Sequence, residues 1–156
     1  MTQIKGLNET YDACRAEGFI QFRKDVDMDL AESLLQSALD GVERSKSSEG
    51  TYEKKTHNYS FAFTEKYDIL RKLLDALLLF DKAKSSKHQC GNAYICINHK
   101  ELEFDWETLE TMRLLRNDVN YEGKRINEEL WKSYKLKFEV YINTLVKEVK
   151  KKLAEK

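Results

Sequence analysis

Residues 61–83 decide the fold and read FAFTEKYDILRKLLDALLLFDKA. Apolar side chains recur there at steps of three or four residues, as on one face of an α-helix: Phe63, Tyr67, Leu70, Leu74 and Leu77. A second set widens this stripe until little polar surface remains: Leu73, Leu78, Leu79 and Phe80. A helix that is apolar nearly all round has to be covered on more than one side. We expect it to form the centre of a helical bundle; packing against a second copy of the chain is the alternative.

Apolar spacing predicts other helices on both sides of this stretch. Asp29 is expected to cap one helix and Asp105 another, while Gly18 and Gly123 are expected to end helices. Two further regions lack a clear period: residues 45–56 are polar and predicted as a loop, and 85–101 as a short helix plus a loop. The predicted helices besides 61–83 cover about 7–17, 29–44, 105–120 and 127–154.

The composition favours the same fold class. The 156 residues include no proline and only six glycines, whereas β-rich folds use both in their turns. We therefore predict an all-α, up-and-down bundle of four or five helices. The chain is expected to be a single domain over residues 1–156, with N-terminal helices at 7–44 and a core at about 61–153.

Charge and cysteine content set the expected environment. The 27 basic and 27 acidic side chains cancel, which argues against a dedicated nucleic-acid coat protein but leaves room for a local basic groove. No apolar run approaches the roughly 20 residues that span a bilayer, and residues 1–10 lack the apolar core of a signal peptide. We expect a cytoplasmic protein without a membrane association, whose three cysteines (Cys14, Cys90 and Cys96) are thiols.

The most informative polar segment is Met112–Gly123, which reads MRLLRNDVNYEG. Arg116 lies four residues after Met112, so its guanidinium falls at the edge of the apolar stripe, where it is costly unless it is paired or used. Asn120 returns to nearly the same side of the helix, and Tyr121 lies at the helix end. The helix therefore ends in a polar cluster beside the core. Pairing of Arg116 with a carboxylate, which would lock two helices together, is the alternative to a role in a cleft.

Together with the helix order, this segment resembles the HEPN family over about residues 61–153. The family's motif is an Arg, then a polar residue that is often Asn, then a His four to six residues on, near the end of a helix in an up-and-down bundle. A family variant carries Tyr in place of His, and Arg116, Asn117 and Tyr121 fit that variant.

The resemblance implies a homodimer whose two motif helices face each other. It implies RNA cleavage without a metal at Arg116, Asn117 and Tyr121, with Arg113 and Asn120 as binding residues for RNA or a partner. It also implies a toxin paired with a small nucleotidyltransferase-like (MNT-type) antitoxin, which in some family members modifies a tyrosine near the motif. Other members have lost catalysis, so a non-catalytic dimeric interaction or scaffold module is the alternative.

The chemistry leaves one role unfilled. Cleavage of this type needs a base for the 2′-hydroxyl and a cation for the charge that develops at phosphorus, and Arg116 suits the second role. A phenol, with an ordinary pKa of about 10, is a poor base near neutral pH, unlike imidazole. His88 or Asp118 would substitute for the motif histidine only if the fold brings either of them close.

No cofactor and no metal site are predicted. His88, Cys90, Cys96 and His99 fall within twelve residues, but their order does not match the paired spacing of zinc ligands. The lysines beyond the 61–83 helix are expected to be solvated, with phosphate contact as the alternative: Lys82, Lys84 and Lys87.

Overall fold

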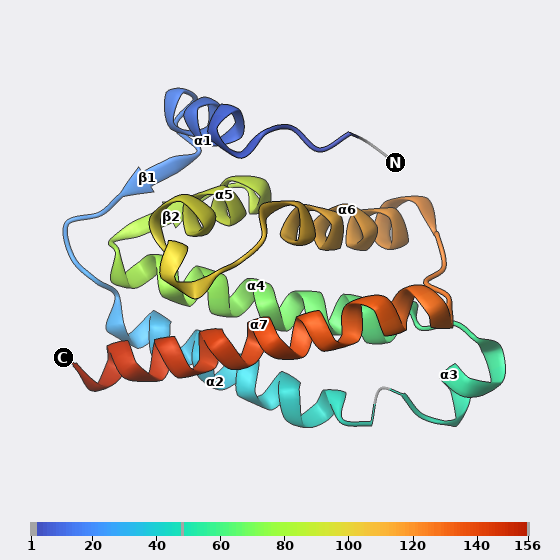
Figure 1. Ribbon diagram of the computed structural model, residues 1–156. Helices are drawn as coiled ribbons and strands as arrows, with labels where there is room; N and C mark the ends of the chain where they lie inside the picture. Colours follow the sequence, from blue (N-terminus) through green and yellow to red (C-terminus); the bar gives the residue numbers. More distant parts are fainter. Residues whose placement is uncertain (1–2, 48, 156) are drawn as a thin grey trace.

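The computed structural model describes residues 3–47 and 49–155. Four long helices (α2, α4, α6 and α7) alternate in direction along the chain, with α5 and α6 on the same side of α4 and with α1 lying outside α5 (Figure 1). This arrangement confirms the predicted all-α bundle. The elements are α1 (Leu7–Ala16), β1 (Ile20–Phe22), α2 (Met28–Ser45), α3 (Thr51–Thr56), α4 (Ser60–Phe80), β2 (Ala83–Ser85), α5 (His88–Asn98), a 3-10 turn (Lys100–Leu102), α6 (Trp106–Glu122) and α7 (Glu128–Ala154).

Helix α4 is the centre of the bundle. It packs against α2 and α7, and also against α5, α6 and β2 (Figure 1). Phe63, Leu70 and Leu77 are fully buried along its length, and the Phe63 ring meets Phe138 of α7 edge to face at 5.1 Å. Burial of each such side chain contributes about 1.5–3 kcal/mol. The expectation that residues 61–83 form a helix covered on several sides is confirmed, although the helix already ends at Phe80.

Helix α6, which carries the Arg116 motif, begins and ends at the residues expected from the sequence. Asp105 accepts a hydrogen bond from the Thr108 amide at 2.9 Å, and Gly123 ends α6 with a φ of 65°, in the left-handed region that glycine adopts without penalty. Both were expected. The cap predicted at Asp29 was wrong: Asp27 accepts from the Leu30 amide at 3.0 Å, because its side chain precedes the first turn of α2, whereas Asp29 lies within that turn.

Two short features were not predicted. β1 and β2 form an antiparallel ribbon in which Ile20 pairs with Ser85, and each strand has three residues, too few to show a period of two. Helix α3 lies within the predicted 45–56 loop; its Glu53 side chain accepts a hydrogen bond from the Gly50 amide at 2.8 Å.

A disulfide joins Cys14 of α1 to Cys90 of α5, so the prediction of thiols was wrong for this pair, while Cys96 is a buried thiol. The bond ties the N-terminal arm to the body of the protein across 76 residues of chain. Disulfides are uncommon in reducing compartments, so this bond weighs against the cytoplasmic location, which stays a prediction. Within the described ranges, none of the helices has the length and apolar character needed to cross a membrane.

A buried histidine joins the ends of α4 and α5. The His99 ring is 7% exposed; its Nε2 lies 2.6 Å from Asp81 Oδ2 and its Nδ1 lies 3.1 Å from Glu101 Oε1. Carboxylates at both nitrogens suit an imidazolium, and the hydrogen bond to Asp81 is the largest factor that raises the pKa of His99. The Tyr94 hydroxyl donates a hydrogen bond to the same Asp81 oxygen at 3.0 Å, so this carboxylate holds the end of α4 to α5 through two side chains.

We expect the double substitution Cys14→Ala with Cys90→Ala to lower the free energy of unfolding by about 2–4 kcal/mol, because the cross-link restricts the unfolded chain. Urea unfolding of the two proteins under non-reducing conditions measures this difference. Thiol titration of the denatured, unreduced wild type should find one thiol per chain; three thiols would contradict the disulfide.

Candidate functional site

The motif residues border a cleft between the start of α5 and the second half of α6. One wall comes from residues 86–89 and the other from α6, and the cleft encloses about 410 Å³. We call it the motif cleft. Its lining comprises Ser86, Lys87, His88, Gln89, Arg113, Arg116, Asn117 and Tyr121.

Arg116 is incompletely paired in this cleft. Its Nη2 lies 3.4 Å from Asp68 Oδ1 of α4, a long contact to a carboxylate that is itself half exposed. The guanidinium carbon lies 5.8 Å from the centroid of the Tyr67 ring, within cation–π range. Its buried Nε has no hydrogen-bond partner among the described residues. Arg116 therefore both joins two helices and keeps donor capacity for an anion.

The Arg113 guanidinium, by contrast, is paired with a carboxylate of the same helix. Its Nε and Nη2 donate to the two carboxylate oxygens of Glu110 at 3.0 and 2.8 Å. Glu110 is 1% exposed and also accepts from Gln89 and from Asn92 of α5. A buried carboxylate satisfied in this way offsets the charge of Arg113 and fastens α6 to α5. Arg113 lines the cleft, but it adds less net charge than the sequence suggested.

His88 completes the cleft with a neutral imidazole. Burial, and then the charges of Arg71, Arg116 and Arg113, lower the pKa of His88 from its usual 6.5 to about 4. The ring lies 6.2 Å from the Tyr67 ring, and the His88 carbonyl accepts a hydrogen bond from Arg71 Nη1 at 3.2 Å. Gly91 leaves room for that guanidinium, since an added Cβ would lie 2.8 Å from Nη1. His88 is thus held among cations and does not carry a charge near neutral pH.

The 86–89 wall is fixed from the outside by the N-terminal arm. The Phe19 carbonyl accepts a hydrogen bond from the Ser86 amide at 3.0 Å. The Lys87 ammonium lies 3.9 Å from the centre of the Phe19 ring. Cys90, two residues after His88, carries the disulfide to α1. The arm therefore positions Lys87 and His88 at the cleft.

The structure brings together most of the residues singled out in the sequence. Asn117 and Tyr121 line the cleft with Arg113 and Arg116, and Tyr121 is 77% exposed at its mouth. Asn120 does not line it: the residue lies one turn beyond Arg116 and is exposed. Asp118 pairs with Lys124 at 3.4 Å and is not part of the cleft lining.

Of the two possible substitutes for the motif histidine, His88 is the one in the cleft. Sequence reasoning could not select it, because nothing in the sequence around residue 88 shows that the start of α5 lies beside the end of α6. All three lysines are exposed, as expected; in addition, Lys87 lines the motif cleft and Lys84 lines a separate pocket.

The charges of the cleft suit an anion with several oxygen atoms. Lys87 and Arg116 supply positive charge that the protein does not fully offset, and the guanidinium fork matches phosphate geometry. A neutral imidazole beside them accepts a proton or a hydrogen bond. The arrangement therefore fits a phosphate group next to a hydroxyl that is to lose its proton.

Comparison of the chain with protein-family profiles, with curated proteins and with solved structures gave no match. The resemblance to the HEPN family consequently stays a prediction.

We expect His88 to titrate near pH 4 in the folded protein, against about 6.5 in the unfolded chain. The unfolded state then binds more protons between these values, so His88 lowers stability as the pH falls from about 6.5 to about 4. Arg116→Gln removes a nearby cation and should raise the pKa, and inorganic phosphate bound in the cleft should raise it further. NMR titration of the imidazole resonances measures all three pKa values.

His57, whose side chain is 71% exposed, provides the internal control for this titration, and Arg116→Gln should leave its resonance unchanged. A pKa near 6.5 for His88 in the wild type, or a His88 pKa that does not change in millimolar phosphate, would contradict the described cleft.

Proposed function

We propose that this protein is a HEPN-like, toxin-type ribonuclease or a weakened relative, which acts on RNA in the motif cleft. The observation that carries the proposal is the incompletely paired Arg116 beside a neutral His88. The Arg116–Asn117…Tyr121 motif supports it through the resemblance, and His88 supplies the acid/base group that this motif lacks.

The reaction follows from the roles of these two side chains. The His88 imidazole accepts the proton of a 2′-hydroxyl, and the 2′-oxygen attacks the adjacent phosphorus. Arg116 stabilises the negative charge that develops on the phosphoryl oxygens. The bond to the 5′-oxygen breaks, that oxygen takes up a proton from water while the His88 imidazolium returns its proton to solvent, and a 2′,3′-cyclic phosphate remains. No metal takes part in this sequence of steps.

The low pKa of His88 bears directly on this step. A base that titrates near pH 4 is always neutral at pH 7 but is weak. A phosphodiester in the cleft adds a negative charge beside Arg116 and so raises the pKa of His88 toward neutrality. The substrate itself therefore strengthens the base, which restricts proton abstraction to the occupied cleft.

The proposed homodimer buries the surface around the Arg116–Asp68 pair. Phe61 and Asp68 line a groove between α2 and α4, while Arg116 and Tyr121 line the motif cleft. The Arg116–Asp68 ion pair therefore links this groove to the motif cleft. Phe61 is 76% exposed, and such a ring is a natural interface anchor. Two clefts brought face to face would double the positive charge presented to RNA.

An MNT-type antitoxin is the proposed second partner. Tyr121 stands at the cleft mouth with its side chain in solvent, so a partner that covers or modifies it would also close the cleft. The competing function is a non-catalytic dimeric interaction module. It is favoured by the commitment of Arg113 to Glu110, which leaves the cleft with fewer free cations than a nuclease site would use.

We expect the wild type to cleave RNA in excess chelator and Arg116→Ala to lose about 10²–10³-fold in rate, as for removal of one transition-state donor. His88→Gln should lose about 10²–10⁴-fold, because the base is absent. Single-turnover cleavage of a labelled RNA, with detection of the cyclic phosphate, measures these rates. Asp118→Asn is the matched control and should retain the wild-type rate, since Asp118 does not line the cleft.

Absence of cleavage by a folded wild type would move the assignment to the interaction module. Equal rates for wild type and His88→Gln would remove His88 from the mechanism while leaving the ribonuclease intact.

The dimer provides a separate test. Light scattering should give twice the chain mass for the wild type at micromolar concentration and one chain mass for Phe61→Glu, because a buried carboxylate without a partner disrupts an interface. Leu136→Glu is the matched control: it changes another exposed hydrophobic side chain, 66% exposed on α7, and this variant should remain a dimer. A monomeric wild type would contradict the two-cleft arrangement.

A further inference from the structure

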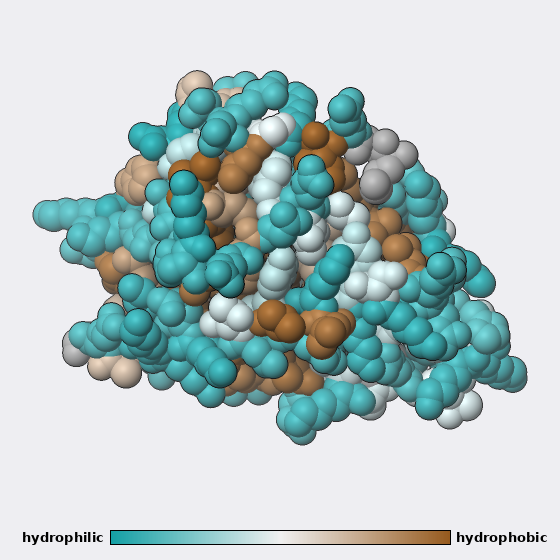
Figure 2. Space-filling view, viewed as in Figure 1, coloured by the Kyte–Doolittle hydropathy of each residue, from teal (hydrophilic) through white to brown (hydrophobic). Residues whose placement is uncertain are grey.

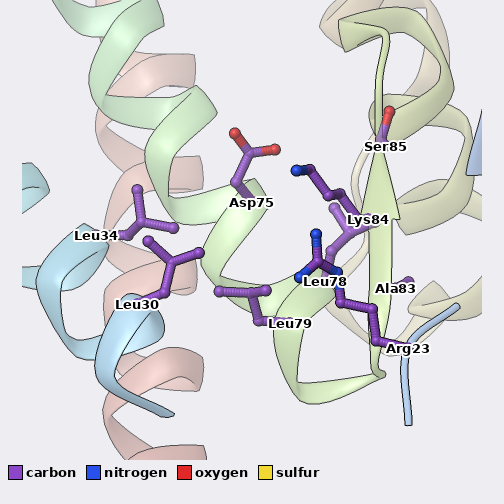
Figure 3. A pocket seen from close by; sticks show the side chains of 9 residues that line it. All are labelled: Arg23, Leu30, Leu34, Asp75, Leu78, Leu79, Ala83, Lys84 and Ser85. Atoms are coloured by element: carbon purple, nitrogen blue, oxygen red, sulfur yellow. The ribbon is translucent and has the colours of Figure 1, made fainter. Parts of the chain in front are cut away.

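A second hollow lies between the first turns of α2, the end of α4 and the ribbon of β1 and β2 (Figure 3). It encloses about 220 Å³, below the usual range for drug-sized ligands. We call it the amphipathic pocket, because its floor is aliphatic and its rim is charged. The floor comprises Leu30, Leu34, Leu78, Leu79 and Ala83, and the rim comprises Arg23, Asp75, Lys84 and Ser85.

The amphipathic pocket is separate from the motif cleft. Strand β2 and the turn after it divide them, with Ser85 lining the pocket and Ser86 lining the cleft. Leu30 is 45% exposed, although it belongs to this floor, so an aliphatic surface stays open to solvent here. Elsewhere the hydrophobic side chains on the face seen in Figure 2 form small, separate patches on a mostly hydrophilic surface.

The charges at the rim do not cancel. Asp75 is paired with Arg71 at 3.1 Å, so the charge of this carboxylate is largely offset within the protein, and burial raises its pKa. Among the described residues, neither Arg23 nor Lys84 forms an ion pair within 4.0 Å. In Figure 3 the Lys84 side chain extends from the ribbon toward the Asp75 carboxylate, and its charge acts on that carboxyl, while the Arg23 guanidinium lies above the floor. The pocket thus offers two cations without a close ion pair over an aliphatic floor, and Arg23 is the less offset of the two.

We infer that the amphipathic pocket binds a small aliphatic carboxylate, such as a short- or medium-chain fatty acid anion. Leucine and alanine side chains accept an alkyl chain, and the absence of aromatic rings from the lining gives no stacking surface for a planar ligand. The carboxylate meets Arg23, which forms charge-assisted bonds to both oxygens, and Lys84. The volume of about 220 Å³ limits the length of the chain.

The test is calorimetric titration of the full chain with the carboxylates butanoate, hexanoate, octanoate and dodecanoate. Each methylene that enters the pocket should lower Kd about fourfold, and the gain should stop when the chain outgrows the pocket. 1-Octanol, which has the same chain without the charge, should bind at least tenfold more weakly than octanoate. Methyl NMR should show shifts confined to the leucines of the floor.

Two variants test the assignment to this pocket. Arg23→Gln with Lys84→Gln should weaken octanoate binding at least tenfold. Leu30→Trp places a larger side chain at an exposed position and should block octanoate binding. Lys24→Gln with Lys82→Gln is the matched control, since it removes two neighbouring charges from residues outside the lining and should leave Kd unchanged.

Equal affinity for octanol and octanoate would overturn the carboxylate assignment. An unchanged Kd in the Arg23 and Lys84 double variant, or no leucine methyl shifts up to the solubility limit of octanoate, would overturn the site. Circular dichroism of each variant establishes that it is folded before it is titrated.

Discussion

The burial of helix α4 on several sides is the constraint on which the rest of the structure depends. Its apolar residues leave no broad face for solvent, so α2, α5, α6, α7 and β2 all have to pack against it. The direction of each neighbouring helix is then set by short connections, which produces the alternating bundle of Figure 1. The amphipathic pocket lies where this cover is incomplete, between α2 and the ribbon, whereas the motif cleft lies between the start of α5 and α6.

Arg71 is the buried charged residue of that helix, and it lies between the motif cleft and the amphipathic pocket. Arg71 is 9% exposed; its Nη2 pairs with Asp75 and its Nη1 donates a hydrogen bond to the His88 carbonyl. A buried guanidinium is costly unless its donors are used, and its Nε has no partner among the described residues. The same side chain therefore contacts Asp75 at the rim of the amphipathic pocket and His88 at the motif cleft.

The sequence predicted those elements whose signal is local. Helix α7 shows a long apolar period, α6 begins at the Asp105 cap, and Gly123 adopts the left-handed conformation that its position at the helix end suggests. Contacts between distant parts of the chain were missed. Cys14 and Cys90 are 76 residues apart, and three-residue strands carry no readable period. Arg116 was singled out because a guanidinium at the edge of an apolar stripe is a local anomaly, whereas His88 has no such anomaly around it.

The division of charge among three arginines explains what the motif cleft is able to do. Arg113 is matched by the buried Glu110, and Arg71 by Asp75, both at hydrogen-bonding distance. Arg116 has only the longer contact to the half-exposed Asp68. Burial, and then all three arginine charges, lower the pKa of His88 and keep its imidazole neutral. An incoming phosphate therefore finds one arginine ready to bind it, and by offsetting that charge it also changes the proton affinity of the neighbouring base. Binding and proton transfer in this cleft therefore both depend on the incompletely paired guanidinium of Arg116.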